Sequence, residues 1–398
     1  MLYLNELGMV CPLGYAPAEI TRRLFKGDSG VLLTEAYSIG RPLPLGCLPV
    51  WESVSACRWP LLEALPRRDR SRNNQLALAA LAQIRPAVEE MIERFGRDRV
   101  GVVVGTSTSG IAEGEAAFRE YAATGQLPPG FHYGQQELGS PAAVIAAALG
   151  TGGPAYTHSS ACASSAKAMA SAARLIKAGF CEAVVTGGVD ALCGYTVEGF
   201  SALESVSPTR CNPFSVNRNG INIGEGAALF LMSAEPATVA LRGWGESSDA
   251  YHISAPDPAG TGAERAIEQA LLRAGISASS IDYINLHGTA TLQNDSMESR
   301  VIHRLFGGSV PVSSTKPLTG HALGAASAIE AGLCWLAMQD DNPYGLLPPH
   351  RWDGQPDPAL PALQLVGRGD SLGRPLRWAL SNSFAFGGTN AALVLGRE

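Results

Sequence analysis

The chain has 398 residues, of which 46% are hydrophobic and only 17% charged, so it can bury a large core and is neither disordered nor fibrous. Its formal net charge of −6 argues against a nucleic-acid-binding protein, although a local basic patch could still meet an acidic partner. No run reaches the roughly 18 apolar residues that span a bilayer, and the amino terminus lacks the pattern of a signal peptide. Eight cysteines without a CxxC pair favour a reducing compartment. We therefore expect a soluble cytoplasmic α/β protein.

Strands and helices are predicted to alternate along most of the chain. Apolar runs without alternation are typical of strands that are covered on both faces, and alanine-rich segments that stop at glycine are typical of helices. The predicted strands lie within residues 99–110, 181–192, 282–292 and 376–388, and the predicted helices span 141–150, 164–179, 264–275 and 324–338. This alternation predicts layers of helix and sheet.

A faint internal echo suggests two related halves. The segment VVVGTST ends at Thr108 and INLHGTAT ends at Thr291, so each closes a predicted strand with Gly-Thr-small-Thr. The second half would begin near residues 237–251. Because Gly-Thr pairs at strand ends are common, the echo alone leaves duplication and chance equally open.

The densest basic run is LPRRDRSRNNQ, which carries Arg67, Arg68, Arg70 and Arg72. From the sequence it is either the solvated start of a helix or a docking site for an acidic partner.

Cys162 lies among small residues in YTHSSACASSAKA, at the start of a predicted helix. If Ser159 or Ser160 caps that helix, the sulfur lies at the positive end of the helix dipole, where a thiolate is stabilised. Cys162 is then a nucleophile, and the alternative is a packed, inert cysteine. His158 lies four residues earlier, but two ligands do not make a structural zinc site, so we expect no metal.

Two histidines lie in glycine-rich turns at the ends of predicted elements. His287 stands in NLHGTATLQND, and His321 follows Lys316 by five residues in STKPLTGHALGAAS. Two imidazoles and a cysteine in such positions predict an acyl-transfer site. The turn Phe386-Gly387-Gly388 could point backbone N–H groups at an oxyanion, or could be a tight turn only.

The motifs SSACASSA, HGTAT followed by ND, KPLTGHALGAAS and NSFAFGGTN, in this order, resemble those of elongating β-ketoacyl-acyl carrier protein synthases. The resemblance covers nearly the whole chain. It implies a thiolase-like fold of two duplicated halves in αβαβα layers, with residues 1–240 carrying the cysteine and residues 241–398 carrying both histidines.

The resemblance also implies the chemistry. Cys162 would accept the acyl group, and His287 and His321 would hold the malonyl thioester carbonyl while carbon dioxide leaves. Lys316 and Glu298 would form a supporting ion pair. The remaining implied residues are Thr289 and Thr291 for the pantetheine arm, the N–H groups of Cys162 and Phe386 for the oxyanion hole, Phe386 as gate, Thr108 near the acyl tunnel, and Phe384 and Gly387 beside the substrate.

Several positions depart from the family pattern. Ala385 replaces the first glycine of the gate loop, which should restrict its backbone. Leu292 stands in place of a proline, and Ser215 and Asn219 in place of acids. The polar residues 135–137 lie where the floor of an acyl tunnel is expected, which hints at a polyene or polyketide-like product.

The resemblance implies no resident cofactor, since the phosphopantetheine arm is carried by an acidic acyl carrier protein. Arg67, Arg68, Arg70 and Arg72 are then the candidate dock, with Arg22, Arg23 and Lys26 as second choice. The chain would pair with a second copy or with a related chain-length subunit. Three alternatives remain: a coenzyme A-using thiolase or priming synthase, a non-catalytic chain-length partner, and a cysteine hydrolase.

Overall fold

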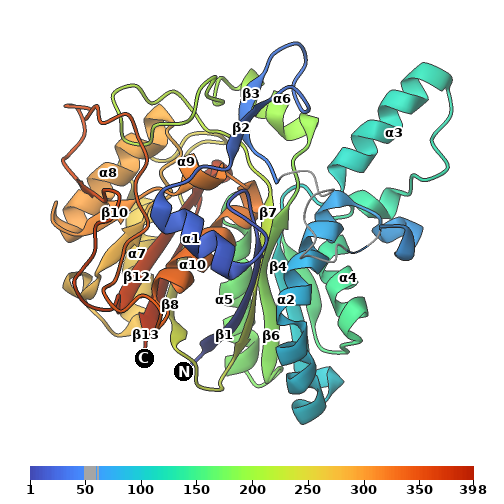
Figure 1. The fold of residues 1–398 in the computed structure, drawn as a ribbon, viewed down its shortest axis with the longest axis horizontal. Coiled ribbons are helices and arrows are strands. Elements are labelled where there is room, and N and C mark those ends of the chain that lie inside the picture. Colours follow the sequence, from blue (N-terminus) through green and yellow to red (C-terminus); the bar gives the residue numbers. More distant parts are fainter. Residues whose placement is uncertain (49–59, 61) are drawn as a thin grey trace.

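Eleven strands form one mixed sheet in the computed structural model, which describes residues 1–48, 60 and 62–398 (Figure 1). The order across the sheet is β11-β10-β9-β12-β13-β8-β1-β7-β6-β4-β5. The strands are β1 (Tyr3–Val10), β4 (Val100–Gly105), β5 (Ala155–His158), β6 (Ala183–Asp190), β7 (Gly226–Ser233), β8 (Val239–Ser248), β9 (Tyr283–Asn285), β10 (Pro311–Ser313), β11 (Gln364–Leu365), β12 (Trp378–Ala385) and β13 (Thr389–Arg397).

The same five-strand pattern occurs twice in this sheet. In the order β5-β4-β6-β7-β1 the first two pairings are parallel and the next two antiparallel, and β10-β9-β12-β13-β8 repeats this sequence of pairings. The two patterns meet where Tyr3 of β1 pairs with Ala240 of β8. The duplicated halves that the resemblance implied are therefore present in the strand pairing.

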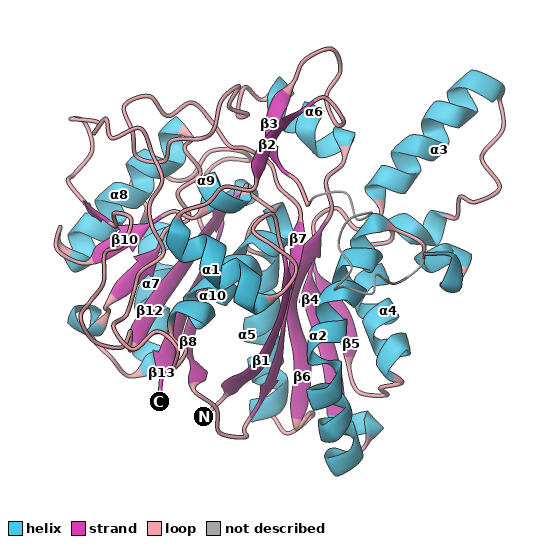
Figure 2. Cartoon of the chain, in the orientation of Figure 1, coloured by secondary structure: helices cyan, strands magenta, loops and turns pink. Residues whose placement is uncertain are grey.

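Helices cover the sheet in layers, as Figure 2 shows. α5 and α10 pack against each other between the two halves, α2 and α4 cover the first half, and α7 and α8 cover the second. α10 is buried on nearly every side, which explains its almost uniformly apolar sequence. The helices are α1 (Pro17–Lys26), α2 (Arg72–Phe95), α3 (Ile111–Thr124), α4 (Ser140–Leu149), α5 (Ser164–Lys177), α6 (Gly194–Ala202), α7 (Thr261–Ala274), α8 (Leu292–Phe306), α9 (Lys316–Thr319) and α10 (Ala326–Ala337).

The four predicted helices match α4, α5, α7 and α10 within about three residues. The four predicted strands also exist, but each is shorter than the segment that contains it, because the ends of these segments form loops. β9 keeps only three residues, and His287 lies just beyond it. The expected αβαβα fold class is confirmed.

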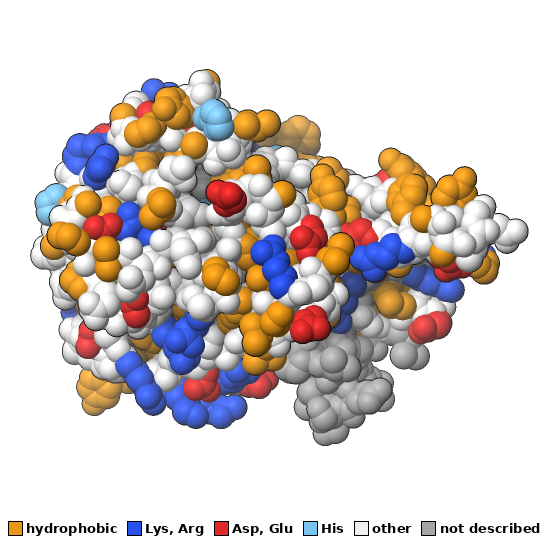
Figure 3. Space-filling view, turned by 90° about the horizontal axis from the view of Figure 1, so that it is seen from above, with side chains coloured by type: hydrophobic (Ala, Val, Ile, Leu, Met, Phe, Trp, Pro, Cys, Tyr) orange, Lys and Arg blue, Asp and Glu red, His pale blue; other side chains and the backbone are white. Residues whose placement is uncertain are grey.

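α3 projects away from the layered body together with the loop that follows it (Figure 1). It buries only Gly114 and Ala117, whereas Phe118 and Tyr121 are 62% and 51% exposed. Figure 3 shows the apolar side chains on this arm from above. A separate hairpin of β2 (Val31–Thr34) and β3 (Leu43–Gly46) lies beside α6.

The predicted boundary between residues 240 and 241 falls inside β8, and it stays a prediction. Within the described residues, no helix combines enough length and apolar character to cross a membrane. Seven cysteines are described as free thiols, while Cys57 lies outside the described residues.

Candidate active site

Cys162 lies in the tight connection between β5 and α5, and its side chain is only 5% exposed. The expected cap by Ser159 or Ser160 is wrong: Cys162 precedes the helix, and α5 has no side-chain cap. The hydroxyl of Ser164 shapes this turn instead, because it accepts the Ser160 N–H at 2.8 Å and donates to the Ala161 carbonyl. Ala161 has a φ of +47°, so the backbone bends sharply just before the sulfur.

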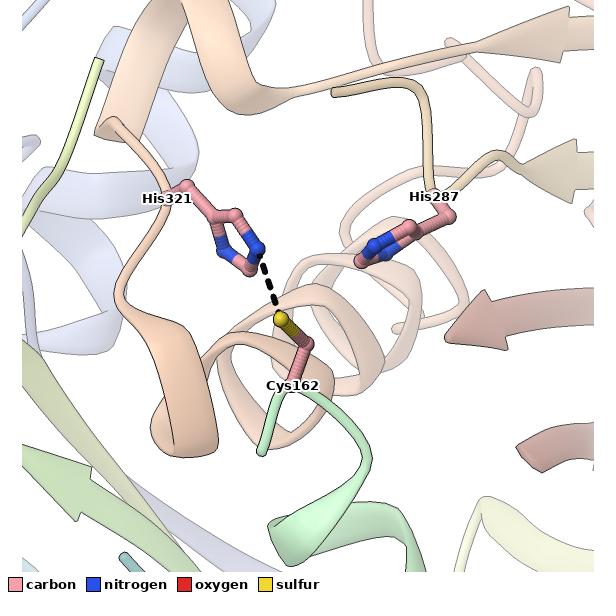
Figure 4. Close-up of side chains that lie close together, drawn as sticks. All are labelled: Cys162, His287 and His321. Carbon is pink, nitrogen blue, oxygen red and sulfur yellow. Dashed lines mark hydrogen bonds between the residues drawn. The ribbon is translucent and has the colours of Figure 1, made fainter. Parts of the chain in front are cut away.

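Both histidines of the second half converge on this sulfur. Nε2 of His321 lies 3.1 Å from Sγ of Cys162, and the ring centroids of His287 and His321 are 5.4 Å apart at 84° (Figure 4). Sγ and one nitrogen of each ring all lie within 4.8 Å of one another. The predicted convergence of three residues from distant parts of the chain is therefore present.

The backbone of each histidine is held from outside its own turn. His321 donates its N–H to Asn222 and accepts from Gly224, which joins its turn to the segment before β7. His287 donates its N–H to a carboxylate oxygen of Glu298 at 2.8 Å. These bonds anchor the backbone of each histidine next to the sulfur.

The three residues line one cleft of about 200 Å³. Thr289 and Thr291 line it as well, with their hydroxyls 2.9 Å apart. Phe384 and Phe386 also contribute; the ring of Phe384 is edge-on to His287, and that of Phe386 lies 5.4 Å from Phe200. The cleft therefore combines an apolar wall, a pair of hydroxyls and the thiol of Cys162.

Burial controls the protonation states in the cleft. It lowers the pKa of His287 and His321 well below the ordinary value, and the positive charge of Lys316 lowers both further. Both imidazoles are thus neutral near pH 7. Burial also raises the pKa of Cys162 to about 12, against the smaller lowering effects of Lys316 and the Phe386 N–H. The expected stabilised thiolate is therefore wrong for the resting site, where the thiol keeps its proton.

The expected ion pair between Lys316 and Glu298 is also wrong. The ammonium of Lys316 pairs with Glu330 of α10, and both side chains are buried. Glu298 instead accepts the N–H groups of His287 and Gly288 at 2.8 and 2.7 Å, so it shapes the turn that carries His287. Burial raises the pKa of Glu298 to about 7.

Two other predicted residues have surroundings that differ from expectation. Thr108 is not among the residues that line the cleft, because its hydroxyl and N–H both donate to the buried carboxylate of Asp190. Ala385 is extended, with a φ of −96°, so the alanine is unstrained there. Gly387 and Gly388, at +80° and +71°, have the left-handed conformations of the gate turn.

Only part of the arginine cluster faces solvent. Arg67 and Arg68 are exposed, whereas Arg70 donates to the carbonyls of Leu65 and Glu63. Arg72 pairs at 2.8 Å with the buried Glu225, so it supports the fold and does not belong to a docking surface.

The polar segment 135–137 also has partners within the chain. Gln135 is buried and donates to the Arg70 carbonyl, and the carboxylate of Glu137 lies 3.7 Å from Arg68. Its polarity therefore has a local structural explanation.

Sequence reasoning missed Glu330 and Asp190. Each is a single acid in a run without other charges, GAASAIEAGLCWLAM and AVVTGGVDAL. An isolated acid in a buried segment needs a partner, and that was the available signal.

Two family models match consecutive parts of the chain. The model "Beta-ketoacyl synthase, N-terminal domain" matches residues 7–237, and "Beta-ketoacyl synthase, C-terminal domain" matches residues 238–350. Nodulation protein E of Rhizobium sp. (strain N33) is 35% identical over 98% of both chains. The 3-oxoacyl-[acyl-carrier-protein] synthase 2 of Staphylococcus aureus is 29% identical over 98% of this chain and 99% of the relative.

A similar solved structure is the complex of the ketosynthase ApeO with its chain length factor ApeC from Xenorhabdus doucetiae. The matched chain superposes with a TM-score of 0.91 and is 45% identical, covering 100% of this chain and 98% of the other.

Proposed function

The chain belongs to the β-ketoacyl synthase family, and on this premise we propose that Cys162, His287 and His321 carry out its decarboxylative Claisen condensation. The reaction joins an acyl thioester to malonyl-acyl carrier protein and releases carbon dioxide, in fatty acid or polyketide-like biosynthesis. The supporting observation is the 3.1 Å contact between Cys162 and His321, with His287 in the same cleft.

The first half-reaction transfers the acyl group to the enzyme. As the thioester carbonyl approaches, the proton of Cys162 passes to Nε2 of His321, and the sulfur attacks the carbonyl carbon. The backbone N–H groups of Cys162 and Phe386 stabilise the oxyanion. The carbon–sulfur bond to the carrier then breaks, and the carrier thiolate takes the proton from His321. This route needs a neutral His321, which its lowered pKa provides.

The second half-reaction uses both imidazoles as donors. Once Cys162 is acylated, no thiol proton faces Nε2 of His321, and the neutral ring can carry its own proton on that nitrogen. One N–H of each imidazole then points at the malonyl thioester oxygen. Loss of carbon dioxide leaves an enolate whose negative charge these donors stabilise. The enolate carbon attacks the acyl-cysteine carbonyl, the bond between that carbonyl and Sγ breaks, and the released Cys162 thiolate takes a proton from water.

Intact-mass measurement tests this proposal. We predict that the wild type, incubated with a panel of acyl-carrier proteins, gains the mass of one acyl group on Cys162. The Cys162→Ala variant should gain none, yet should still decarboxylate malonyl-carrier protein, because both histidine donors remain. A covalent acyl adduct on Cys162→Ala would refute the assignment of the nucleophile.

The proposal includes partners but no resident metal or prosthetic group. The thiol and both imidazoles take part in the chemistry, and the phosphopantetheine arm arrives on the carrier protein. The Xenorhabdus ketosynthase is held in a complex with a chain length factor, so we infer that this chain also works as a dimer, with a copy of itself or a related subunit. A cytoplasmic location suits a nucleophilic thiol that must stay reduced.

A further inference from the structure

Two buried serines connect the nucleophile to the strand that carries the gate. Oγ of Ser327, in α10, donates to the carbonyl oxygen of Cys162 at 2.8 Å and lies 2.7 Å from Oγ of Ser383 in β12. The exposed fractions of the two serines are 1% and 2%. These contacts join three segments that are far apart in the sequence.

The directions of the hydrogen bonds follow from counting protons. A serine hydroxyl has one proton and can accept two. Ser327 donates its only proton to the Cys162 carbonyl, so Ser383 must be the donor in the 2.7 Å hydrogen bond between the two hydroxyls. The two hydrogen bonds form a chain from Ser383 through Ser327 to the Cys162 carbonyl, which we call the serine relay. In a buried environment each of these hydrogen bonds strengthens the next.

The relay lies between the two sources of the oxyanion hole. One donor is the N–H of Cys162 itself, and the other is the N–H of Phe386, three residues after Ser383. These N–H groups belong to different halves of the molecule, and an oxyanion is held only where both point to one spot. The relay fixes the Cys162 carbonyl relative to β12, so it sets the distance between the two donors.

A second contact between α10 and the nucleophile segment provides a comparison. The N–H of Ala328 donates to Oγ of Ser165 at 2.9 Å, one residue beyond Ser327. This bond holds the same helix against α5 but has no link to β12.

Resting on the function proposed above, we infer that Ser327 is a positioning residue for acyl transfer and acts with Ser383 to align the two oxyanion donors. The malonyl carbonyl is held by His287 and His321, so decarboxylation does not depend on this alignment. The serine relay thus serves the steps at the acyl carbonyl and not the decarboxylation of the malonyl group.

The test measures both half-reactions in the same variants. In Ser327→Ala, transfer of the acyl group from acyl-carrier protein to Cys162 should slow about 10- to 100-fold, while malonyl decarboxylation stays within about twofold of wild type. Ser383→Ala keeps the bond to the Cys162 carbonyl, so it should slow acyl transfer only about 3- to 10-fold. It also tests the relay if Ser327→Ala folds poorly.

Two controls separate positioning from general support of the fold. Ser165→Ala should lower the melting temperature without separating the two half-reactions. The double variant Ser327→Ala/Ser383→Ala should be no slower than Ser327→Ala, because Ser383 acts through Ser327. Equal losses in both half-reactions, the same separation in Ser165→Ala, or additive effects of the two serines would each overturn the inference. If the wild type transfers no acyl group to Cys162, the proposed function itself is wrong. If the wild type is active and Ser327→Ala transfers the acyl group at the same rate, only the positioning role of Ser327 is wrong.

Discussion

The buried ammonium of Lys316 helps to keep the active-site histidines neutral. It lowers the pKa of both His287 and His321, in addition to the effect of burial, and its charge is balanced by Glu330. Removing Lys316 alone would leave Glu330 buried without a counter-charge, which typically costs about 3 to 5 kcal/mol. The pair is best removed as a unit.

We predict that Lys316→Met/Glu330→Gln moves the acid limb of acyl transfer to higher pH. A histidine whose pKa is lowered in the folded site stays neutral until the pH falls below that value. Without the Lys316 charge the pKa of His321 rises toward its ordinary value, and the protonated ring cannot accept the Cys162 proton. The rate of acylation, followed by intact mass between pH 5 and about 8, reports the shift.

The Lys316→Arg variant is the matched control, since it keeps a positive charge beside Glu330. Its acid limb should stay close to that of wild type. An acid limb that does not move in the double variant, or moves to lower pH, would show that the Lys316 charge does not act on His321.

At the residue scale the sequence predicted which side chains meet in the cleft better than it predicted the residues that support them. Cys162, His287 and His321 stand in distinctive glycine-bordered motifs, and they do meet. The partner of Lys316 was predicted wrongly, because the choice between Glu298 and Glu330 depends on how α8 and α10 pack around the ammonium. Local spacing does not determine such packing.

At the scale of elements, the gate is a short turn between β12 and β13 with two left-handed glycines. At Gly387 a Cβ would meet no atom within 4 Å, whereas at Gly388 it would lie 2.9 Å from Cβ of Asp249. Two substitutions therefore separate backbone strain from steric clash in the same turn.

We predict that Gly387→Ala lowers the free energy of unfolding by about 1 to 2 kcal/mol, the usual cost of a left-handed alanine. Gly388→Ala has the same strain and also displaces Asp249, which accepts a hydrogen bond from Asn390, so it should cost more. Urea unfolding of both variants beside wild type measures the difference. Equal losses would mean that the clash is relieved at no cost and that strain alone sets the stability of the turn.

Elements with strong local signals were predicted well. Gly150 and Gly275 cap α4 and α7, and Gly179 follows the cap of α5. α10 also matches its predicted range closely, although its cap is Met338 and not a glycine. The strand predicted within residues 282–292 was too long, because β9 keeps only three residues. β10, which also has three residues, was not predicted. An apolar run shows that a segment is buried, but only strand pairing decides where the ladder ends.

At the scale of the whole molecule, the active site exists only because two halves meet. Cys162 comes from the first half and both histidines from the second, and α5 and α10 join them at the centre. The faint echo between VVVGTST and INLHGTAT marks β4 and β9, which occupy equivalent places in the two five-strand patterns. Sequence alone left this echo ambiguous because the rest of each half has diverged, whereas the pairing order has not.

The surface of the whole molecule decides how a carrier protein arrives. Of the predicted dock, Arg67 and Arg68 are exposed, whereas Arg72 is engaged by Glu225 and Arg70 by backbone carbonyls. The testable patch is therefore the pair Arg67 and Arg68. Such positive charges would mainly increase the association rate of an acidic carrier protein, and salt would reduce this increase by screening the charges.

We predict that Arg67→Glu/Arg68→Glu raises the KM for acyl-carrier protein about 3- to 10-fold at low salt, by loss of electrostatic steering. The KM for a small thioester without a carrier should not change, since Arg67 and Arg68 do not line the cleft. Arg265→Glu, an exposed reversal on α7 in the other half, is the matched control and should leave both constants unchanged. Adding salt should shrink the gap between wild type and the double reversal, because screening weakens the attraction that wild type alone retains. An equal rise for carrier and small thioester, or a gap that does not respond to salt, would place the dock elsewhere on the molecule.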